Sequence, residues 1–138
     1  MTASPPAGVP QVTIERLVEW RDTDASGHYH HATVVRWVEA AEAELLDQLG
    51  LVRLFGVMPR VRYEVDYTAR LWFRDRAAVQ LWVAEVGRAS VRYEFAVRRG
   101  DEIAASGSMT AVNIDPTAGR SSAWPDDVRA VLAGGPER

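Results

Sequence analysis

Apolar and polar residues alternate with a period of two through much of the second half of the chain. The pattern is clearest in residues 60–69, where charged residues separate Val61, Tyr63, Val65 and Tyr67. A period of two places alternate side chains on opposite faces of a β-strand. The same pattern, with bounding turn residues, predicts about five strands. These strands are residues 11–20, 60–69, 77–87, 90–100 and 103–115.

Residues 34–50 follow a different rhythm, which predicts one long helix. Apolar residues recur at spacings of three and four, and such a stripe is typical of a helix that packs on a core. Glu39, Glu42 and Asp47 are expected to face mostly away from that stripe, and Gly50 is a suitable residue to end the helix. The stripe consists of Val34, Val38, Ala41, Leu45 and Leu49.

The links between the last three strands are short. Residues 86–88 and 99–101 each contain a glycine and are the size of hairpin turns, so these strands are expected to form an antiparallel meander. One strand, one helix and four further strands predict an α+β fold, in which an antiparallel sheet of about five strands wraps around the helix. Large apolar residues on both faces of the strands predict a homodimer or homotetramer. They include Trp72, Phe73, Trp82, Tyr93 and Phe95.

The length of 138 residues fits a single domain. Residues 1–10 are rich in proline and small side chains and are expected to be a disordered segment. The domain is expected to span residues 11–132, with a short last helix at 126–132. Residues 133–138 are expected to be a loose tail.

Composition narrows the class of protein. The chain has no cysteine, which excludes a disulfide framework, a thiolate zinc site and a cysteine nucleophile. The net charge of −3, without a basic run, makes nucleic acid an unfavoured partner. No secretory signal or membrane-spanning stretch is found, so a cytoplasmic protein is expected.

One stretch carries most of the candidate chemistry: WRDTDASGHYHHATVVRW, residues 20–37. Asp22 and Asp24 lie two positions apart, a glycine follows, and three histidines fall within four positions before the helix. The stretch is open to interpretation as a catalytic turn, a metal site or a polar loop. Neutral imidazoles of His28 and His30 with an aspartate would suit zinc, but their spacing matches no known metal signature, and no metal or other cofactor is predicted.

These residues resemble the hotdog-fold acyl-CoA thioesterases, in particular the 4-hydroxybenzoyl-CoA thioesterase branch that includes the Tol–Pal-associated enzymes. That branch has an aromatic residue, Asp-x-Asp, a small pair and a glycine before a helix, which here are Trp20, 22–24, 25–26 and Gly27. Weaker similarities continue to residue 132. The resemblance implies a hotdog fold and hydrolysis of a coenzyme A (CoA) or acyl-carrier-protein thioester.

The resemblance also implies roles for individual residues. The second aspartate of the motif is the catalytic carboxylate in that branch, which here is Asp24, and the histidine before the helix is His31. Arg88 and Ser90, in the GRAS turn, are the implied contacts to CoA. The chain departs from the branch at Thr33 and Val34, where Asn or Ser and then Tyr are often found, and also directly after the glycine, where His28 and Tyr29 replace an apolar pair.

The chemistry of thioester hydrolysis fits this placement. A carboxylate can attack the thioester or activate water. The start of a helix offers unpaired N–H groups to a developing oxyanion, which here are backbone amides near His31 and Ala32. Gly27 would let the backbone approach the substrate, and Tyr29 and His30 are candidates to line the acyl slot.

Each assignment has a structural alternative. Asp24 can cap the turn, His31 can be a packed helix-start residue, and Arg88 can be a solvated hairpin arginine; for Asp22 a structural turn role is favoured. Two other functions stay open at this point. One is a hotdog dehydratase or hydratase that acts on β-hydroxyacyl thioesters, and the other is a protein that binds acyl thioesters without catalysis.

Overall fold

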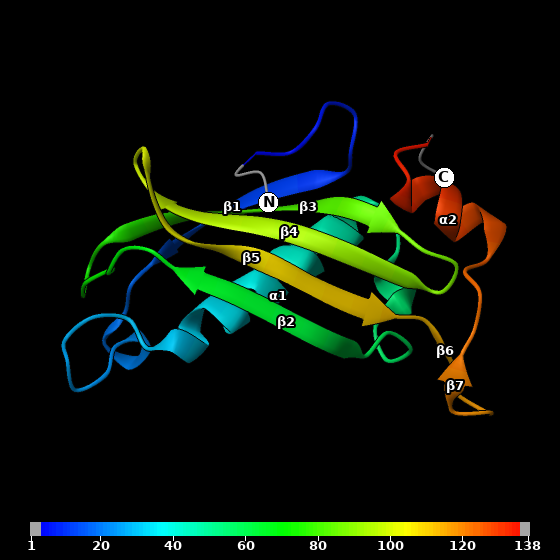
Figure 1. The fold of residues 1–138 in the computed structure, drawn as a ribbon, viewed down its shortest axis with the longest axis horizontal. Helices are drawn as coiled ribbons and strands as arrows, with labels where there is room; N and C mark the ends of the chain where they lie inside the picture. Colours follow the sequence, from blue (N-terminus) through cyan, green and yellow to red (C-terminus); the bar gives the residue numbers. More distant parts are fainter. Residues whose placement is uncertain (1–3, 136–138) are drawn as a thin grey trace.

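The computed structural model describes residues 4–135, which form one antiparallel sheet around one long helix (Figure 1). The strand order across the sheet is β1-β3-β4-β5-β2, so the first and second strands are the two edges. This arrangement confirms the predicted α+β fold and its antiparallel meander. The strands are β1 (Gln11–Leu17), β2 (Arg60–Tyr67), β3 (Arg76–Val86), β4 (Ser90–Arg99) and β5 (Glu102–Val112).

The core lies between one face of the sheet and helix α1 (His31–Gln48). The predicted apolar stripe of the helix is confirmed, because Val34, Val38, Ala41 and Leu45 are all buried. Alternate residues of the strands meet this stripe, among them Tyr93 of β4. Removing these apolar surfaces from water is the main force that holds the helix in the curve of the sheet.

Two expectations for the helix were wrong. It begins at His31, three residues before the predicted start, because the side chain of His30 caps its first turn. Glu42 does not face solvent: it is completely buried and pairs with Arg60 of β2. A buried charge costs much less when an opposite charge lies beside it, which explains how a glutamate is tolerated there.

The first strand also ends earlier than predicted. The chain leaves β1 after Leu17 and forms a short 3-10 turn, η1 (Trp20–Asp22), on which Trp20 is 75% exposed. Trp72 and Phe73 are not on a strand face; they lie in the loop between β2 and β3 and are largely exposed. Some of the large apolar residues that were predicted on the faces of the sheet therefore belong to an aromatic cluster at one end of the molecule.

The other end of the sheet carries the last part of the chain (Figure 1). A second short 3-10 turn, η2 (Val52–Leu54), follows α1, and a small hairpin of β6 (Ile114–Asp115) and β7 (Arg120–Ser121) follows β5. Helix α2 (Asp126–Leu132) has the predicted bounds. The predicted disordered segment 1–10 and loose tail 133–138 lie partly outside the described residues. Within residues 4–135, no helix combines the length and the apolar character needed to cross a membrane.

Candidate active site

The two aspartates of the motif have opposite environments. Asp22 is 5% exposed, and its Oδ2 accepts a hydrogen bond from the Glu19 N–H at 2.8 Å. Its Oδ1 lies 3.4 Å from the Arg36 guanidinium, and its carbonyl accepts from the His30 N–H and the Thr33 hydroxyl. These contacts tie η1 to the start of α1, which agrees with the structural role favoured for Asp22.

Asp24 is exposed and faces solvent. Its Oδ1 accepts hydrogen bonds from the N–H and the hydroxyl of Ser26, two residues further along the turn. These bonds, the hydroxyl bond foremost, lower the pKa of the Asp24 carboxyl below its ordinary value of 3.8. The side chain is therefore an anion at neutral pH. Because it is not buried, a substrate can reach it.

The turn that carries Asp24 closes tightly. The Asp24 N–H donates to the His28 carbonyl, and the Gly27 N–H donates to the Asp24 carbonyl at 2.9 Å. Gly27 has φ +90°, a conformation that L side chains rarely adopt. A β-carbon at this position would meet the Trp72 ring at 3.5 Å. The turn therefore favours glycine at position 27, a β-carbon would make only an ordinary contact with the indole, and the role of Gly27 toward substrate stays a prediction.

The start of α1 lies against the same turn. The Ala32 N–H donates to His30 Nδ1 at 3.0 Å, and the Thr33 N–H donates to the His30 carbonyl. Among residues 4–135, the N–H of His31 has no hydrogen-bond partner. The Tyr67 hydroxyl donates to the His31 carbonyl, and burial raises the pKa of Tyr67, so the phenol keeps its proton at neutral pH. This bond joins the end of β2 to the first turn of the helix.

A cleft of about 760 Å³ lies between these elements. Three of the predicted site residues, Asp24, Tyr29 and His31, line it together. Among the described residues, no hydrogen bond joins Asp24 to His31. The remaining lining residues are His28, Tyr67, Thr68, Ala69, Arg70, Trp72, Arg99 and Glu102.

The loop between β2 and β3 forms one wall of the cleft and was missed at the sequence level. Trp72 packs edge to face with His28, with ring centroids 5.6 Å apart. Asp75 Oδ2 holds the loop because it accepts hydrogen bonds from the Trp72 N–H at 2.9 Å and from Arg99 at 2.8 Å. Arg74 has φ +77°. The sequence offers no glycine there, so nothing in it signalled this sharp bend.

The other predicted substrate contacts lie elsewhere. His30 and Ala32 are not among the residues that line the cleft, although both belong to the first turn beside it. Arg88 and Ser90 lie at the β3–β4 turn, at the opposite end of the sheet (Figure 1). Strand β3 has 11 residues, so roughly 33 Å separates the two ends. Within one chain, Arg88 and Ser90 therefore do not share a site with Asp24.

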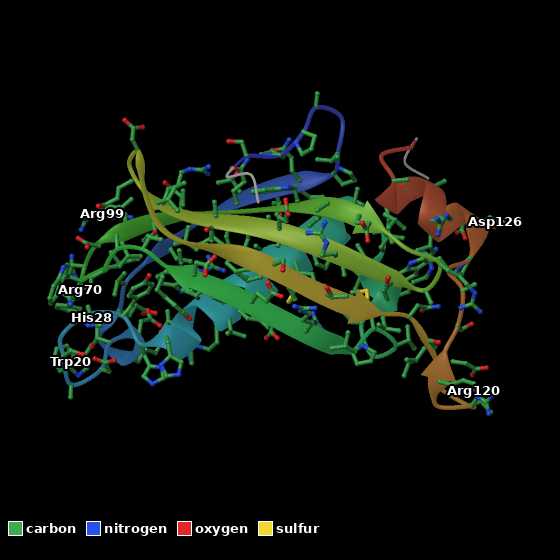
Figure 2. All side chains as sticks on the ribbon, viewed as in Figure 1. Trp20, His28, Arg70, Arg99, Arg120 and Asp126 are labelled. Carbon is green, nitrogen blue, oxygen red and sulfur yellow. The ribbon has the colours of Figure 1, made fainter. Side chains whose placement is uncertain are left out.

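The distribution of labelled side chains shows the same division (Figure 2). Trp20, His28, Arg70 and Arg99 gather at the end of the molecule that holds the cleft, while Arg120 and Asp126 lie at the other. Trp20 packs edge to face on Phe73, with centroids 5.7 Å apart. Among the described residues, no group of three or more histidine, cysteine, aspartate or glutamate side chains has the geometry to hold a metal ion.

Comparison with known proteins identifies the fold and the family. Residues 18–132 match the model of the thioesterase-like superfamily. The chain belongs to this superfamily. A 1,4-dihydroxy-2-naphthoyl-CoA hydrolase from Synechococcus sp. (strain CC9605) is 28% identical over 130 residues, which cover 86% of this chain and 87% of that protein.

Solved structures have the same architecture. A predicted thioesterase from Bacillus stearothermophilus has a TM-score of 0.81 and 26% identity, over 88% of this chain and 93% of that one. A 1,4-dihydroxy-2-naphthoyl-CoA thioesterase from Synechocystis has a TM-score of 0.80 and 18% identity, over 88% and 95%. The fold is therefore the hotdog fold. The protein is a thioester hydrolase of this family, which favours hydrolysis over the dehydratase and the non-catalytic binding protein.

Proposed function

We propose that this protein hydrolyses an acyl-CoA thioester in the Asp24 cleft. The observation that carries the proposal is the meeting of two groups in one cleft. Asp24 offers an ionised, exposed carboxylate, and His31 brings a backbone N–H without a partner within residues 4–135. An anion and a hydrogen-bond donor are what a thioester carbonyl needs for attack at carbon and stabilisation at oxygen.

The reaction follows from these two groups. The His31 N–H donates to the thioester oxygen, and the positive end of the α1 dipole favours the negative charge that develops there. Asp24 either attacks the carbonyl carbon or takes a proton from the water that attacks it. The C–S bond then breaks, the thiolate leaves as CoA and gains a proton, and water supplies the oxygen of the free acid.

An aromatic acyl group is the substrate class that we propose. The Synechococcus relative is named for a naphthoyl-CoA substrate, and the sequence resembles the 4-hydroxybenzoyl-CoA branch. The cleft has aromatic walls from Tyr29, Tyr67 and Trp72, whose rings offer favourable faces and edges to a planar acyl group. Arg70 at the cleft adds positive charge on the path of an anionic CoA thioester, whereas Asp75 and Glu102 balance the charge of Arg99.

We further propose that the working unit is a homodimer paired along β2. Among residues 4–135 this strand bonds only to β5, so its other edge has backbone groups without a partner there, and Val61 on this strand is 60% exposed. Antiparallel pairing of two β2 strands would bring the β3–β4 turn of one copy to the end of the joint sheet that holds the other copy's cleft. Three or four strand spacings, roughly 15–20 Å, would then separate them. In that assembly Arg88 and Ser90 would reach CoA bound by the partner.

A thiol-release assay over a panel of acyl-CoAs tests the proposal. The panel runs from acetyl to palmitoyl and includes benzoyl and hydroxynaphthoyl thioesters. We expect wild type to release thiol fastest from an aromatic member. Asp24→Asn should keep the fold and lower turnover by on the order of 10²–10⁴, the range for loss of a positioned acid–base group.

Asp101→Asn supplies the matched control, because Asp101 is an exposed carboxylate in the β4–β5 turn, outside the residues that line the cleft. It should keep the wild-type rate. Unchanged turnover in Asp24→Asn would remove Asp24 from the mechanism. Absence of thiol release from every member would overturn an acyl-CoA substrate and direct the search to carrier-protein thioesters.

A further inference from the structure

His30 is the one histidine of the motif that does not line the cleft. It precedes α1, is half-buried, and is absent from the residues that line the cleft. Its Nδ1 accepts the Ala32 N–H at 3.0 Å, which makes it the N-cap of the helix. Serine, threonine, aspartate and asparagine are the usual residues in this position, so a histidine cap is a deviation with consequences.

The cap fixes the chemical form of the ring. A nitrogen that accepts a hydrogen bond carries no proton, so the neutral imidazole of His30 must hold its proton on Nε2. The ring also stacks on His31, with centroids 4.1 Å apart and planes inclined by 30°. The His30 N–H donates to the Asp22 carbonyl at 2.7 Å. The ring is thus held between the buried turn and His31, whose N–H we assign to the thioester oxygen.

A protonated His30 could not hold this arrangement. Both ring nitrogens of an imidazolium are donors, so the bond from the Ala32 N–H would be lost. The new positive charge would also lie at the positive end of the helix dipole. Ala32 and His31 belong to the same turn, so loss of the cap would loosen the N–H that we assign to the oxyanion.

We propose that His30 is a positioning residue whose neutral ring caps α1 and holds the His31 N–H in place, and that protonation of this ring switches hydrolysis off. The proposal rests on the function proposed above. Histidine is the residue whose charge ordinarily changes between pH 5 and 8, whereas an asparagine cap would not titrate. The titratable and charged groups around His30 are Asp22 on η1, Asp24 and His28 on the turn, His31 and Arg36 on α1, and Tyr67 on β2.

Three substitutions at this position distinguish the hydrogen bond of the cap from the protonation of the imidazole ring. His30→Asn keeps a cap acceptor and cannot be protonated between pH 5 and 9. His30→Gln has the same amide group as the Asn variant, but its longer side chain does not fit the favoured cap geometry. His30→Ala removes the acceptor. The readout is kcat and KM from pH 5 to 9, on the acyl-CoA that wild type hydrolyses fastest.

We expect His30→Asn to keep kcat at pH 8 within about twofold and to lose the acid limb of the wild-type profile. His30→Gln and His30→Ala should lower kcat by about tenfold, less than the roughly 10²–10³ that follows removal of an oxyanion donor, because the N–H is displaced and not deleted. KM should change less than kcat. Equal losses in the Asn and Ala variants, or an acid limb that persists in His30→Asn, would overturn the proposal.

A second measurement keeps the test independent of activity. Long-range ¹H–¹⁵N correlation spectra of the labelled wild-type protein at pH 8, assigned with His30→Asn, report which ring nitrogen carries the proton. We expect Nδ1 unprotonated and Nε2 protonated. A proton on Nδ1 would overturn the cap. If wild type hydrolyses no acyl-CoA, the proposed function fails, while the spectrum still decides the state of His30.

Discussion

Two carboxylates lie along helix α1, Asp24 just before its start and Glu42 within it, and their surroundings are opposite. At its start, Asp24 is exposed, accepts two hydrogen bonds from Ser26 and has no cation paired with it among the described residues. Further along, Glu42 is completely buried and pairs with Arg60 from β2. The exposed carboxylate is available to a substrate. The carboxylate of Glu42 is buried in the packed interior, and one of its oxygens lacks a hydrogen-bond partner within residues 4–135.

An acid near the helix of a hotdog fold can take part in the reaction or can have a structural role, and its position distinguishes the two. Glu42 is the twelfth residue of α1, so it lies roughly 16 Å along the axis from the first turn, at 1.5 Å a residue. It does not line the cleft that Asp24 and His31 share. Access to the helix start therefore supports Asp24, and not Glu42, as the acid that we propose for the reaction.

Breaking the buried pair should give the largest change in stability. Arg60→Ala leaves the Glu42 charge buried without a partner, and such losses cost about 3–5 kcal/mol of folding free energy. Urea denaturation followed by circular dichroism measures the change. Replacing both residues by Met should restore most of the stability, because no buried charge is then left.

Arg62→Ala is the matched control. Arg62 pairs with Glu64 on the same strand, but the two side chains are 72% and 48% exposed. Exposed pairs contribute about 0–1 kcal/mol, so this variant should change little. A similar loss from the two arginine variants would contradict the distinction between the buried and the exposed pair.

Changing the partner of Asp24 should move its titration and leave the fold intact. The Ser26 hydroxyl is the main cause of the lowered pKa of Asp24. Ser26→Ala should raise this pKa towards its ordinary value of 3.8. A carboxylate acts as an anion above its pKa, so activity and any stability tied to the anion should be lost at a higher pH than in wild type as the solution is acidified.

Carboxyl ¹³C chemical shifts across the titration measure this change directly. Ser26→Thr is the control because it keeps the hydroxyl and should titrate as wild type does. A shift of the Asp24 titration to lower pH in Ser26→Ala would show that the hydroxyl does not stabilise the anion.

The smallest effect is expected in the loop that walls the cleft. Arg74 adopts φ +77°, a left-handed conformation that costs an L-residue about 1–2 kcal/mol. Arg74→Gly removes this strain, but glycine gives back roughly 0.5–1 kcal/mol through the entropy of the unfolded chain. The net gain should be about 0.5–1 kcal/mol, seen as a higher Tm.

Arg70→Gly in the same loop provides the comparison, since Arg70 has no positive φ. It should lower Tm slightly. A loss of stability in Arg74→Gly would mean that contacts of the arginine side chain outweigh the backbone strain.

The sequence predicted the sheet well because each strand carries its own period of two. Through the resemblance of residues 20–31 to a known motif, it also singled out Asp24, the aspartate that lines the cleft, and the catalytic role of Asp24 stays a prediction. It failed where a residue depends on distant partners. The burial of Glu42 depends on Arg60, 18 positions away, and nothing in the helical pattern marks that pair. The start of α1 was missed because histidine is an uncommon cap, and Arg74 occupies a bend where glycine would have been the signal.

Single-turnover hydrolysis with Asp24→Asn tests the central claim most directly. Excess variant is mixed with the aromatic acyl-CoA that wild type hydrolyses fastest, and bound substrate and released thiol are followed separately. Our account predicts that the variant binds the thioester with near wild-type affinity and releases thiol at least about 100-fold more slowly, because the carboxylate acts on the reaction and not on the fold. Thiol release at the wild-type rate from the bound thioester would contradict it.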